Sequence, residues 1–195
     1  MCIRDRVYPF TDSQILGIST FPYSLKDFFL EGTQQVSASW ITLENLSFPY
    51  CISINSSYIY EQSTDERINQ NDAAITLAHE LGHYLGLRHV FSEGGTTSMC
   101  TDTDYCKDTP SYNRSEYEQW LNNLDKQNKY QLKDLAKRYS CEKGEYEAHN
   151  IMDYAYCFYN EITLEQRKRI RHILNYSPLI PGPKESRIDT RGVQG

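Results

Sequence analysis

Hydrophobic residues in the first sixty positions gather in three short clusters rich in β-branched and aromatic side chains, which are typical of β-strands. Turn-forming residues separate these clusters, which cover residues 15–21, 36–43 and 50–60. Within the third cluster, residues 51–55 alternate strictly between apolar and polar positions, which indicates a half-buried strand. The N-terminal part of the chain is therefore predicted to form strands.

Later segments carry apolar residues at helical spacing instead. A first helix is expected to begin near Asn71 or Asp72, because either residue can cap it. Its apolar stripe is predicted to consist of Ala74, Leu77, Leu81 and Leu85.

Two further helical segments are marked by capping boxes. Residues 115–139 begin with Ser115 and Glu118, and the last helix begins with Thr163 and Gln166. The glycine-containing stretch 92–108 is predicted to be a loop.

Length and composition fit one domain, since the chain has 195 residues and 39% of them are hydrophobic. We expect this domain to cover residues 1–176 and a proline-containing tail or linker to cover 177–195. Residues 1–6 lack the apolar run of a signal peptide. We therefore expect that the natural N-terminal part is missing and that these six residues are non-native.

Charge excludes some partners. The net charge of -6 disfavours binding to nucleic acid or to anionic membranes through bulk electrostatics. No stretch approaches the eighteen apolar residues needed to span a bilayer. Neither kind of partner is expected.

The chemistry is concentrated in the run from Ala78 to His89. His79 and His83 are four residues apart and would share one face of a helix, while Gly86 can end that helix and bring His89 back as a third metal ligand. A lone histidine on a helix is more often only hydrogen-bonded, but the combined spacing matches a zinc site. Three ligands leave one position open for water, and Glu80 stands where a general base should stand. The run therefore predicts a catalytic zinc site.

This run resembles the extended zinc-binding motif of the metzincin metalloproteases, which also have a methionine-bearing turn further along the chain. The stretch from His149 to Tyr154 resembles that Met-turn. The resemblance implies that Met152 forms the apolar floor beneath the metal and that Tyr154 contacts the metal or the reaction oxyanion. Methionine also commonly fills gaps in ordinary cores.

Within the metzincins, the residues from Leu87 to Phe91 resemble the pappalysin pattern, of the bacterial secreted or lipoprotein type. The resemblance covers about residues 68–174. It implies an α+β, zincin-like fold, in which a mixed twisted sheet and an active-site helix lie above a mostly irregular or helical C-terminal subdomain. It also implies that residues 51–55 form the edge strand that pairs with substrate, although the same residues fit a simple half-buried strand.

The implied function is zinc-dependent hydrolysis of peptide bonds in a protein or peptide substrate, by a monomer. Zinc would polarise the scissile carbonyl, and Glu80 would take a proton from the attacking water. The alternative is a non-catalytic adhesion or binding module that keeps zinc on a metzincin scaffold. The intact Glu80 argues against that alternative.

Four of the six cysteines lie between the histidine motif and the end of the Met-turn region. Four cysteines allow three connectivities; the resemblance implies two bridges in this region, and we take Cys100 with Cys141 and Cys106 with Cys157 as the expected pairing. A second zinc site is the competing interpretation, but the cysteines lack its short paired spacing. Disulfides imply a secreted, periplasmic or cell-surface protein, with lipid anchoring open for the full-length protein.

Three aspartates at positions 102, 104 and 108 offer oxygen ligands that calcium prefers. The resemblance to pappalysins allows calcium here, but acidic loops are also commonly solvated without any ion. Calcium is therefore carried as a second candidate metal beside zinc.

Overall fold

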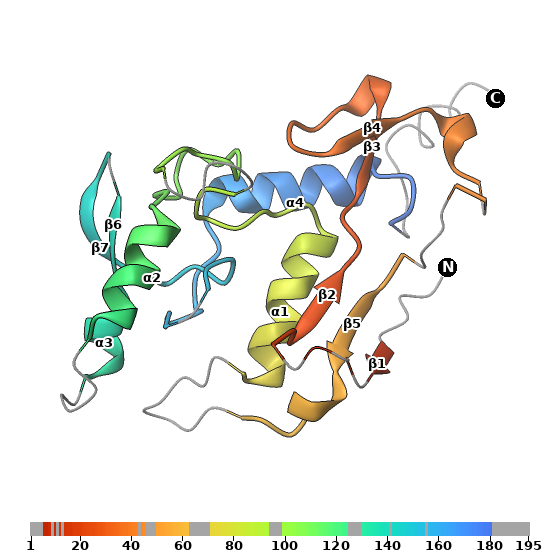
Figure 1. Cartoon of the computed structure of the whole chain (residues 1–195). Helices are drawn as coiled ribbons and strands as arrows, with labels where there is room; N and C mark the ends of the chain where they lie inside the picture. Colours follow the sequence, from red (N-terminus) through yellow and green to blue (C-terminus); the bar gives the residue numbers. More distant parts are fainter. Residues whose placement is uncertain are drawn as a thin grey trace.

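The computed structural model describes residues 6–8, 10, 12, 14–42, 44–45, 50–62, 71–93, 99–124, 130–140, 142–154 and 156–180. Its central element is the helix α1 (Ala73–Tyr84). In Figure 1, α1 lies in the middle of the molecule, with the strands of the N-terminal part on one side of it. No helix of the described residues is long and apolar enough to cross a membrane.

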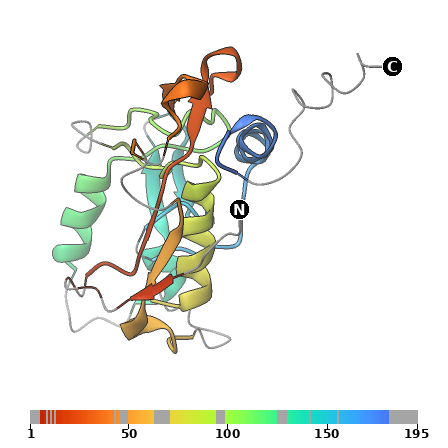
Figure 2. The same cartoon turned by 90° about the vertical axis from the view of Figure 1, so that its right-hand side faces the viewer.

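The main sheet has three strands in the order β1 (Arg6–Tyr8), β5 (Ile52–Asn55), β2 (Gly17–Ser19). β1 runs parallel to β5, and β2 runs antiparallel to it. The predicted mixed sheet is therefore confirmed. β2 and β5 both pack against α1, and Figure 2 shows these strands beside the helix.

The prediction that residues 51–55 form the edge strand was wrong, because β5 lies between β1 and β2 and is buried at every position. Its polar residues Ser53 and Asn55 are inside the protein. The Asn55 amide donates a hydrogen bond to the Ile15 carbonyl at 2.8 Å, so this polar side chain is satisfied without water. The polar residues of this alternating segment are therefore buried and do not face solvent. Within the described residues, β2 forms the edge of the sheet on this side.

The predicted strand at residues 36–43 was also misplaced. Val36, where that strand was expected to begin, is the last residue of β4 (Gln34–Val36). β4 pairs in parallel with another short strand, β3 (Tyr23–Leu25). The chain then turns through a 3₁₀ helix, η2 (Ala38–Trp40). The Trp40 ring packs 5.2 Å from the Tyr23 ring, which ties this turn to β3. Two other 3₁₀ turns are η1 (Lys26–Phe28) and η3 (Ser56–Tyr58).

The C-terminal half contains α2 (Arg114–Asn122), α3 (Leu132–Leu135), the hairpin of β6 (Lys137–Ser140) with β7 (Gly144–Glu147), and α4 (Leu164–Tyr176). The helical excursion predicted for 115–139 is therefore interrupted and ends in a strand. Asn113 caps α2 by accepting a hydrogen bond from the Glu116 N–H at 3.1 Å, in place of the predicted Ser115. The capping box of Thr163 and Gln166 is confirmed at the start of α4.

Two hydrophobic clusters hold α1 in place. The first joins β5, the end of α1 and α4, and consists of Tyr50, Ile52, Ile54, Tyr84, Ile173, Leu179 and Ile180. The second lies under the Met-turn and consists of Leu87, Val90, Phe91, Tyr112, Tyr117 and Met152. In Figures 1 and 2, α4 runs across the C-terminal end of α1. Residues 177–180, predicted as the start of the tail, include members of the first cluster, and residues 181–195 lie outside the described part of the chain.

The buried face of α1 differs from the predicted apolar stripe. Leu77 and Leu81 are 38% and 39% exposed, whereas the buried positions of the helix include Thr76, His79 and Glu80. The helix thus points its functional face, and not its leucines, at the rest of the protein. The combination of a mixed sheet, an active-site helix and a largely irregular C-terminal region confirms the predicted α+β class.

Candidate active site

The start of α1 is fixed by Asp72, one of the two predicted caps. Its carboxylate accepts hydrogen bonds from the backbone N–H groups of Ala74 at 2.8 Å and Ile75 at 3.3 Å. This satisfies two donors at the first turn, which lack partners inside the helix. The helix then runs to Tyr84 and carries His79 and His83 one turn apart on the same face.

Gly86 ends the helix as predicted, with a φ of 89° in the left-handed region. The Gly86 N–H donates to the His83 carbonyl and the Leu87 N–H donates to the Gly82 carbonyl, both at 2.9 Å. This pair of bonds is a Schellman motif, which reverses the chain direction at the helix end. A side chain at Gly86 would also collide with Ile173 of α4. The reversal brings His89 back toward the two helical histidines.

The three histidines converge on one point. Nε2 of His89 lies 3.1 Å from Nε2 of His79 and 3.0 Å from Nε2 of His83. Nitrogens bound tetrahedrally to a metal at about 2.0–2.1 Å are separated by roughly 3.4 Å, so the cluster fits a single ion closely. Among the described residues, this is the one group of three that meets the geometry of a metal site. The residues present therefore fit the metal that the motif implies.

The opposite nitrogen of each ring has an acceptor. Nδ1 of His79 donates to the Ile151 carbonyl at 2.7 Å, and Nδ1 of His83 donates to the Leu87 carbonyl at 2.8 Å. Nδ1 of His89 contacts the Glu93 carboxylate. These acceptors place the proton on Nδ1 and leave the Nε2 lone pairs for a metal.

Burial and the neighbouring imidazoles keep two of these rings neutral. Burial, with added repulsion from His83 and His89, lowers the pKa of His79 to about 3. Burial and the proximity of His89 lower the pKa of His83 to about 4. A neutral imidazole is the form that binds a metal ion.

Glu80 follows His79 but is not part of the histidine cluster. It is only 8% exposed, and burial raises the pKa of its carboxyl group to about 7. A side-chain carbon at Gly17 of β2 would come within 2.8 Å of Glu80, so glycine allows the strand to pass close over this residue. Glu80, His79 and Tyr154 line a cavity of about 830 Å³ beside the histidines.

Met152 is fully buried, and its role as the floor of the metal site stays a prediction. A Cβ atom at Gly82 would overlap its sulfur, so the glycine inside the histidine motif is required for this close contact. The turn is shaped by Asn150, whose side-chain oxygen accepts the Met152 N–H at 3.0 Å. Sequence reasoning did not single out Gly82, although its position between two ligands was a usable signal.

Tyr154 lies beside the histidine cluster. Its ring centroid is 4.3 Å from that of His89 and 5.4 Å from that of His79. Burial, with a further contribution from the Glu80 charge, raises the pKa of its hydroxyl to about 12. The side chain remains 38% exposed, so it can face a ligand in the cavity.

A buried ion pair supports the turn that carries Met152 and Tyr154, and sequence reasoning missed it. Asp153 lies 3.5 Å from the Arg138 guanidinium and accepts a hydrogen bond from the Tyr112 hydroxyl at 2.7 Å. Arg138 also donates to the Tyr154 carbonyl at 3.1 Å and stacks 3.7 Å from the Tyr117 ring. The partners are far apart in the chain, so no local pattern links them.

The predicted Cys106–Cys157 disulfide is wrong, because both thiols are free and buried. Each sulfur contacts a carbonyl of its own loop, Cys106 that of Asp104 at 3.6 Å and Cys157 that of Asn150 at 3.3 Å. Cys100 is disulfide-bonded. Cys141 lies outside the described residues, so its pairing with Cys100 stays a prediction.

The aspartates proposed as calcium ligands do not gather into a site. Asp102 accepts the N–H groups of Asp104 and Tyr105, both at 3.1 Å. Asp104 accepts from Cys106 and Thr109, and Asp108 accepts the Glu165 N–H at the start of α4. These carboxylates therefore stabilise turns and a helix end, and the structure gives no support for calcium.

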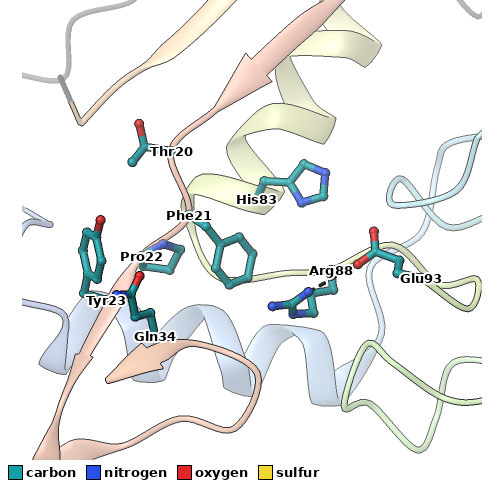
Figure 3. Close-up of a pocket in the computed structure, with 8 residues that line it drawn as sticks. All are labelled: Thr20, Phe21, Pro22, Tyr23, Gln34, His83, Arg88 and Glu93. Atoms are coloured by element: carbon teal, nitrogen blue, oxygen red, sulfur yellow. Dashed lines mark hydrogen bonds and ion pairs between the residues drawn. The ribbon is translucent and has the colours of Figure 1, made fainter. Parts of the chain in front are cut away.

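A second cavity, of about 470 Å³, borders His83 (Figure 3). It shares no lining residue with the first cavity and is bordered by His83. Phe21 and Pro22 form apolar walls, and Arg88 and Glu93 form a polar one. Two separate cavities therefore border the histidine cluster, one at His79 and one at His83.

Comparison with known proteins agrees with this geometry. Residues 40–175 match the model of the family Peptidase_M43, described as pregnancy-associated plasma protein-A. An extracellular metalloprotease of Arthroderma benhamiae is 37% identical over 108 residues, which cover 54% of this chain and 32% of that protein. The extracellular metalloprotease of Arthroderma otae is also 37% identical over 108 residues, which cover 54% of this chain and 33% of that protein.

Among solved structures, mature mirolysin of Tannerella forsythia in complex with a cleaved peptide is similar in fold, with a TM-score of 0.50 and 21% sequence identity. The similarity covers 89% of this chain and 52% of that chain. The chain spans about a third of the length of the curated relatives it matches. The family match, which covers most of the chain, establishes its kinship: the chain belongs to the pregnancy-associated plasma protein-A peptidase family, the pappalysin-type metzincins that its motifs resemble.

Proposed function

We propose that this chain carries the active site of a zinc-dependent endopeptidase. The observation that carries the proposal is the convergence of three Nε2 atoms beside a buried glutamate that borders a cavity. Kinship with extracellular metalloproteases supports the same reaction class.

His79, His83 and His89 would hold the zinc ion through Nε2, since each Nδ1 is already engaged. Bound zinc supplies Lewis acidity, which polarises a carbonyl group and lowers the pKa of water to about 7. Three protein ligands are typical of catalytic zinc sites, whereas structural sites usually have four.

Glu80 is the proposed general base. It lies next to a ligand in sequence and lines the cavity where substrate would bind, and burial brings its pKa to about 7. A base of that pKa can take a proton from the attacking water near neutral pH and then pass it to the leaving amine.

Tyr154 is the proposed second catalytic group. Its hydroxyl is protonated at neutral pH, since its pKa of about 12 lies far above 7. A protonated phenol can donate a hydrogen bond to the oxyanion that develops on the scissile carbonyl.

The edge of β2 is the proposed binding site for the substrate backbone. Gly17 brings this strand against Glu80, and Ile18 is exposed. An extended peptide could add to the edge through main-chain hydrogen bonds and would then lie along the cavity that contains Glu80. We also propose that the protein is exported, in line with its extracellular relatives and the disulfide at Cys100.

The test is cleavage of a denatured protein substrate by wild type and by Glu80→Gln, with zinc content measured for both. Wild type should contain one zinc per chain and cleave the substrate, and the variant should keep zinc and lose at least a hundredfold in rate, in the range of general-base removal. Glu145→Gln is the matched control, because Glu145 is exposed on the β6–β7 hairpin. Near-normal cleavage by Glu80→Gln would contradict the proposed role of the glutamate.

A further inference from the structure

The three histidines differ in the group that their Nδ1 atoms contact. His79 and His83 each donate to a neutral backbone carbonyl, at 2.7 and 2.8 Å. His89 alone has an acidic side chain, Glu93, as its partner. The third ligand is therefore oriented by a charged acceptor that the other two lack.

His89 also has the least support from secondary structure. His79 and His83 belong to α1, whose backbone hydrogen bonds fix the direction of their side chains. His89 lies in the irregular segment after the Schellman turn, where no helix or strand restrains it. Its ring must be held by side-chain contacts, namely the stacked Phe91 ring at 4.8 Å, Tyr154 and Glu93.

Glu93 is itself held in position from two sides. Its second carboxylate oxygen pairs with Arg88 at 3.3 Å, and its backbone N–H donates to the Thr103 hydroxyl at 3.0 Å. Arg88 in turn donates to the Gly32 carbonyl at 2.7 and 3.1 Å and stacks 5.0 Å from the Phe21 ring. Figure 3 shows Arg88 and Glu93 joined on one wall of the smaller cavity, near His83.

We propose that Glu93 is a positioning residue for metal binding: it orients the His89 ring, keeps its proton on Nδ1 and strengthens Nε2 as a ligand. This inference rests on the proposed metal site. A carboxylate behind a ligating imidazole raises the basicity of the ligand, and loss of such a partner typically weakens metal affinity 10- to 100-fold. The sequence gave no sign of a contact between His89 and Glu93. Residues four apart are predictably close only in a helix, and this segment is irregular.

A purely structural role is the competing explanation, in which Glu93 serves mainly to neutralise Arg88. The two roles can be separated because Arg88 and His89 contact different oxygens of the carboxylate. Replacing Arg88 removes the ion pair and leaves the His89 contact in place. Replacing Glu93 removes both.

The experiment measures the dissociation constant for Zn²⁺ by competition with a chromophoric chelator, starting from metal-free protein. Glu93→Ala should weaken zinc binding 10- to 100-fold. Glu93→Gln should lose less, since its amide oxygen can still accept the Nδ1 proton. Arg88→Met should stay within about threefold of wild type, and the exposed control Glu145→Ala should be unchanged. Melting temperatures of the metal-free proteins check that each variant is folded.

The inference is overturned if folded Glu93→Ala binds zinc within twofold of wild type. It is equally overturned if Arg88→Met weakens binding as much as Glu93→Ala, because the effect would then pass through the ion pair. Failure of the proposed function has a different signature, in which the wild-type protein itself binds no zinc.

Discussion

The helix and the Met-turn form two walls of the same histidine cluster, but they are built by different kinds of contact. α1 depends on local bonds, from the Asp72 cap to the Schellman motif at its end. The Met-turn depends on distant side chains, since Tyr112 and Arg138 hold Asp153 and Gln166 donates to Asn150 at 3.0 Å. One wall is therefore fixed wherever the helix forms, whereas the other requires the whole C-terminal region to be folded.

The largest expected effect comes from breaking the distant support of the Met-turn. Arg138→Met leaves the Asp153 carboxylate buried without its cation, and removal of one partner of a buried ion pair costs about 3–5 kcal/mol of stability. The free energy of unfolding is measured by urea denaturation. The helix wall should form in the variant, but the folded state as a whole should be far less stable.

The control is the double variant Arg138→Met/Asp153→Asn, which removes the unpaired charge. It should recover most of the lost stability, because the asparagine can still accept the Tyr112 hydroxyl. Equal instability of the single and double variants would show that Arg138 acts through its carbonyl contacts or its stacking on Tyr117, and not through the ion pair.

The same contrast explains what the sequence predicted about the site. The positions of His79, His83 and His89 follow from helical spacing and from a glycine that ends the helix, and these are local properties. The Met-turn was found because its motif resembles a known family; in the structure Met152 lies against Gly82 and the Tyr154 ring against His89, and their roles stay predictions. Arg138 and Glu93 were missed because their importance depends on contacts made only in three dimensions.

The fold was predicted in class but not in detail, for a related reason. The α+β class and the capping boxes are encoded locally, and so is the start of α1. The order of strands is not, so β5 was taken for an edge strand although it is central. The helical spacing of Leu77 and Leu81 predicted the wrong buried face of α1, because both leucines are partly exposed. The buried face carries His79 and Glu80 instead, and Gly82 lets it pack against Met152.

A smaller effect is expected from relieving the charge that the helix wall buries. Burial raises the pKa of Glu80 from its ordinary 4.5 to about 7. Below pH 4.5 the Glu80 carboxyl group is protonated in both the folded and the unfolded state. Between pH 4.5 and 7 it is protonated only in the folded state, so the free energy of unfolding falls as the pH rises through this range. In metal-free protein, Glu80→Gln should therefore be roughly 2–3 kcal/mol more stable than wild type at pH 8 and no more stable at pH 4. Urea denaturation at both pH values checks this, and a difference that does not change with pH would contradict it.

The smallest effect tests the contact at which the two walls meet. Gly82→Ala improves helix propensity by about 1 kcal/mol, but the new methyl group would overlap the sulfur of Met152. Met152 is fully buried within the second hydrophobic cluster and would have to displace its neighbours, so overpacking of about 1–3 kcal/mol should exceed the helical gain. The net result should be a loss of about 1 kcal/mol in unfolding free energy, together with weaker zinc binding because His79 and His83 would be displaced from the Met-turn.

The sign should reverse when the opposing side chain is shortened. In a Met152→Ala background the overlap disappears, so adding Gly82→Ala should leave only the helical gain and raise stability by up to about 1 kcal/mol. The measurement is a double-mutant cycle of unfolding free energies. If Gly82→Ala is destabilising in both backgrounds, the glycine is needed by α1 itself; if it is destabilising only beside Met152, the glycine serves the junction between the local wall and the distant one.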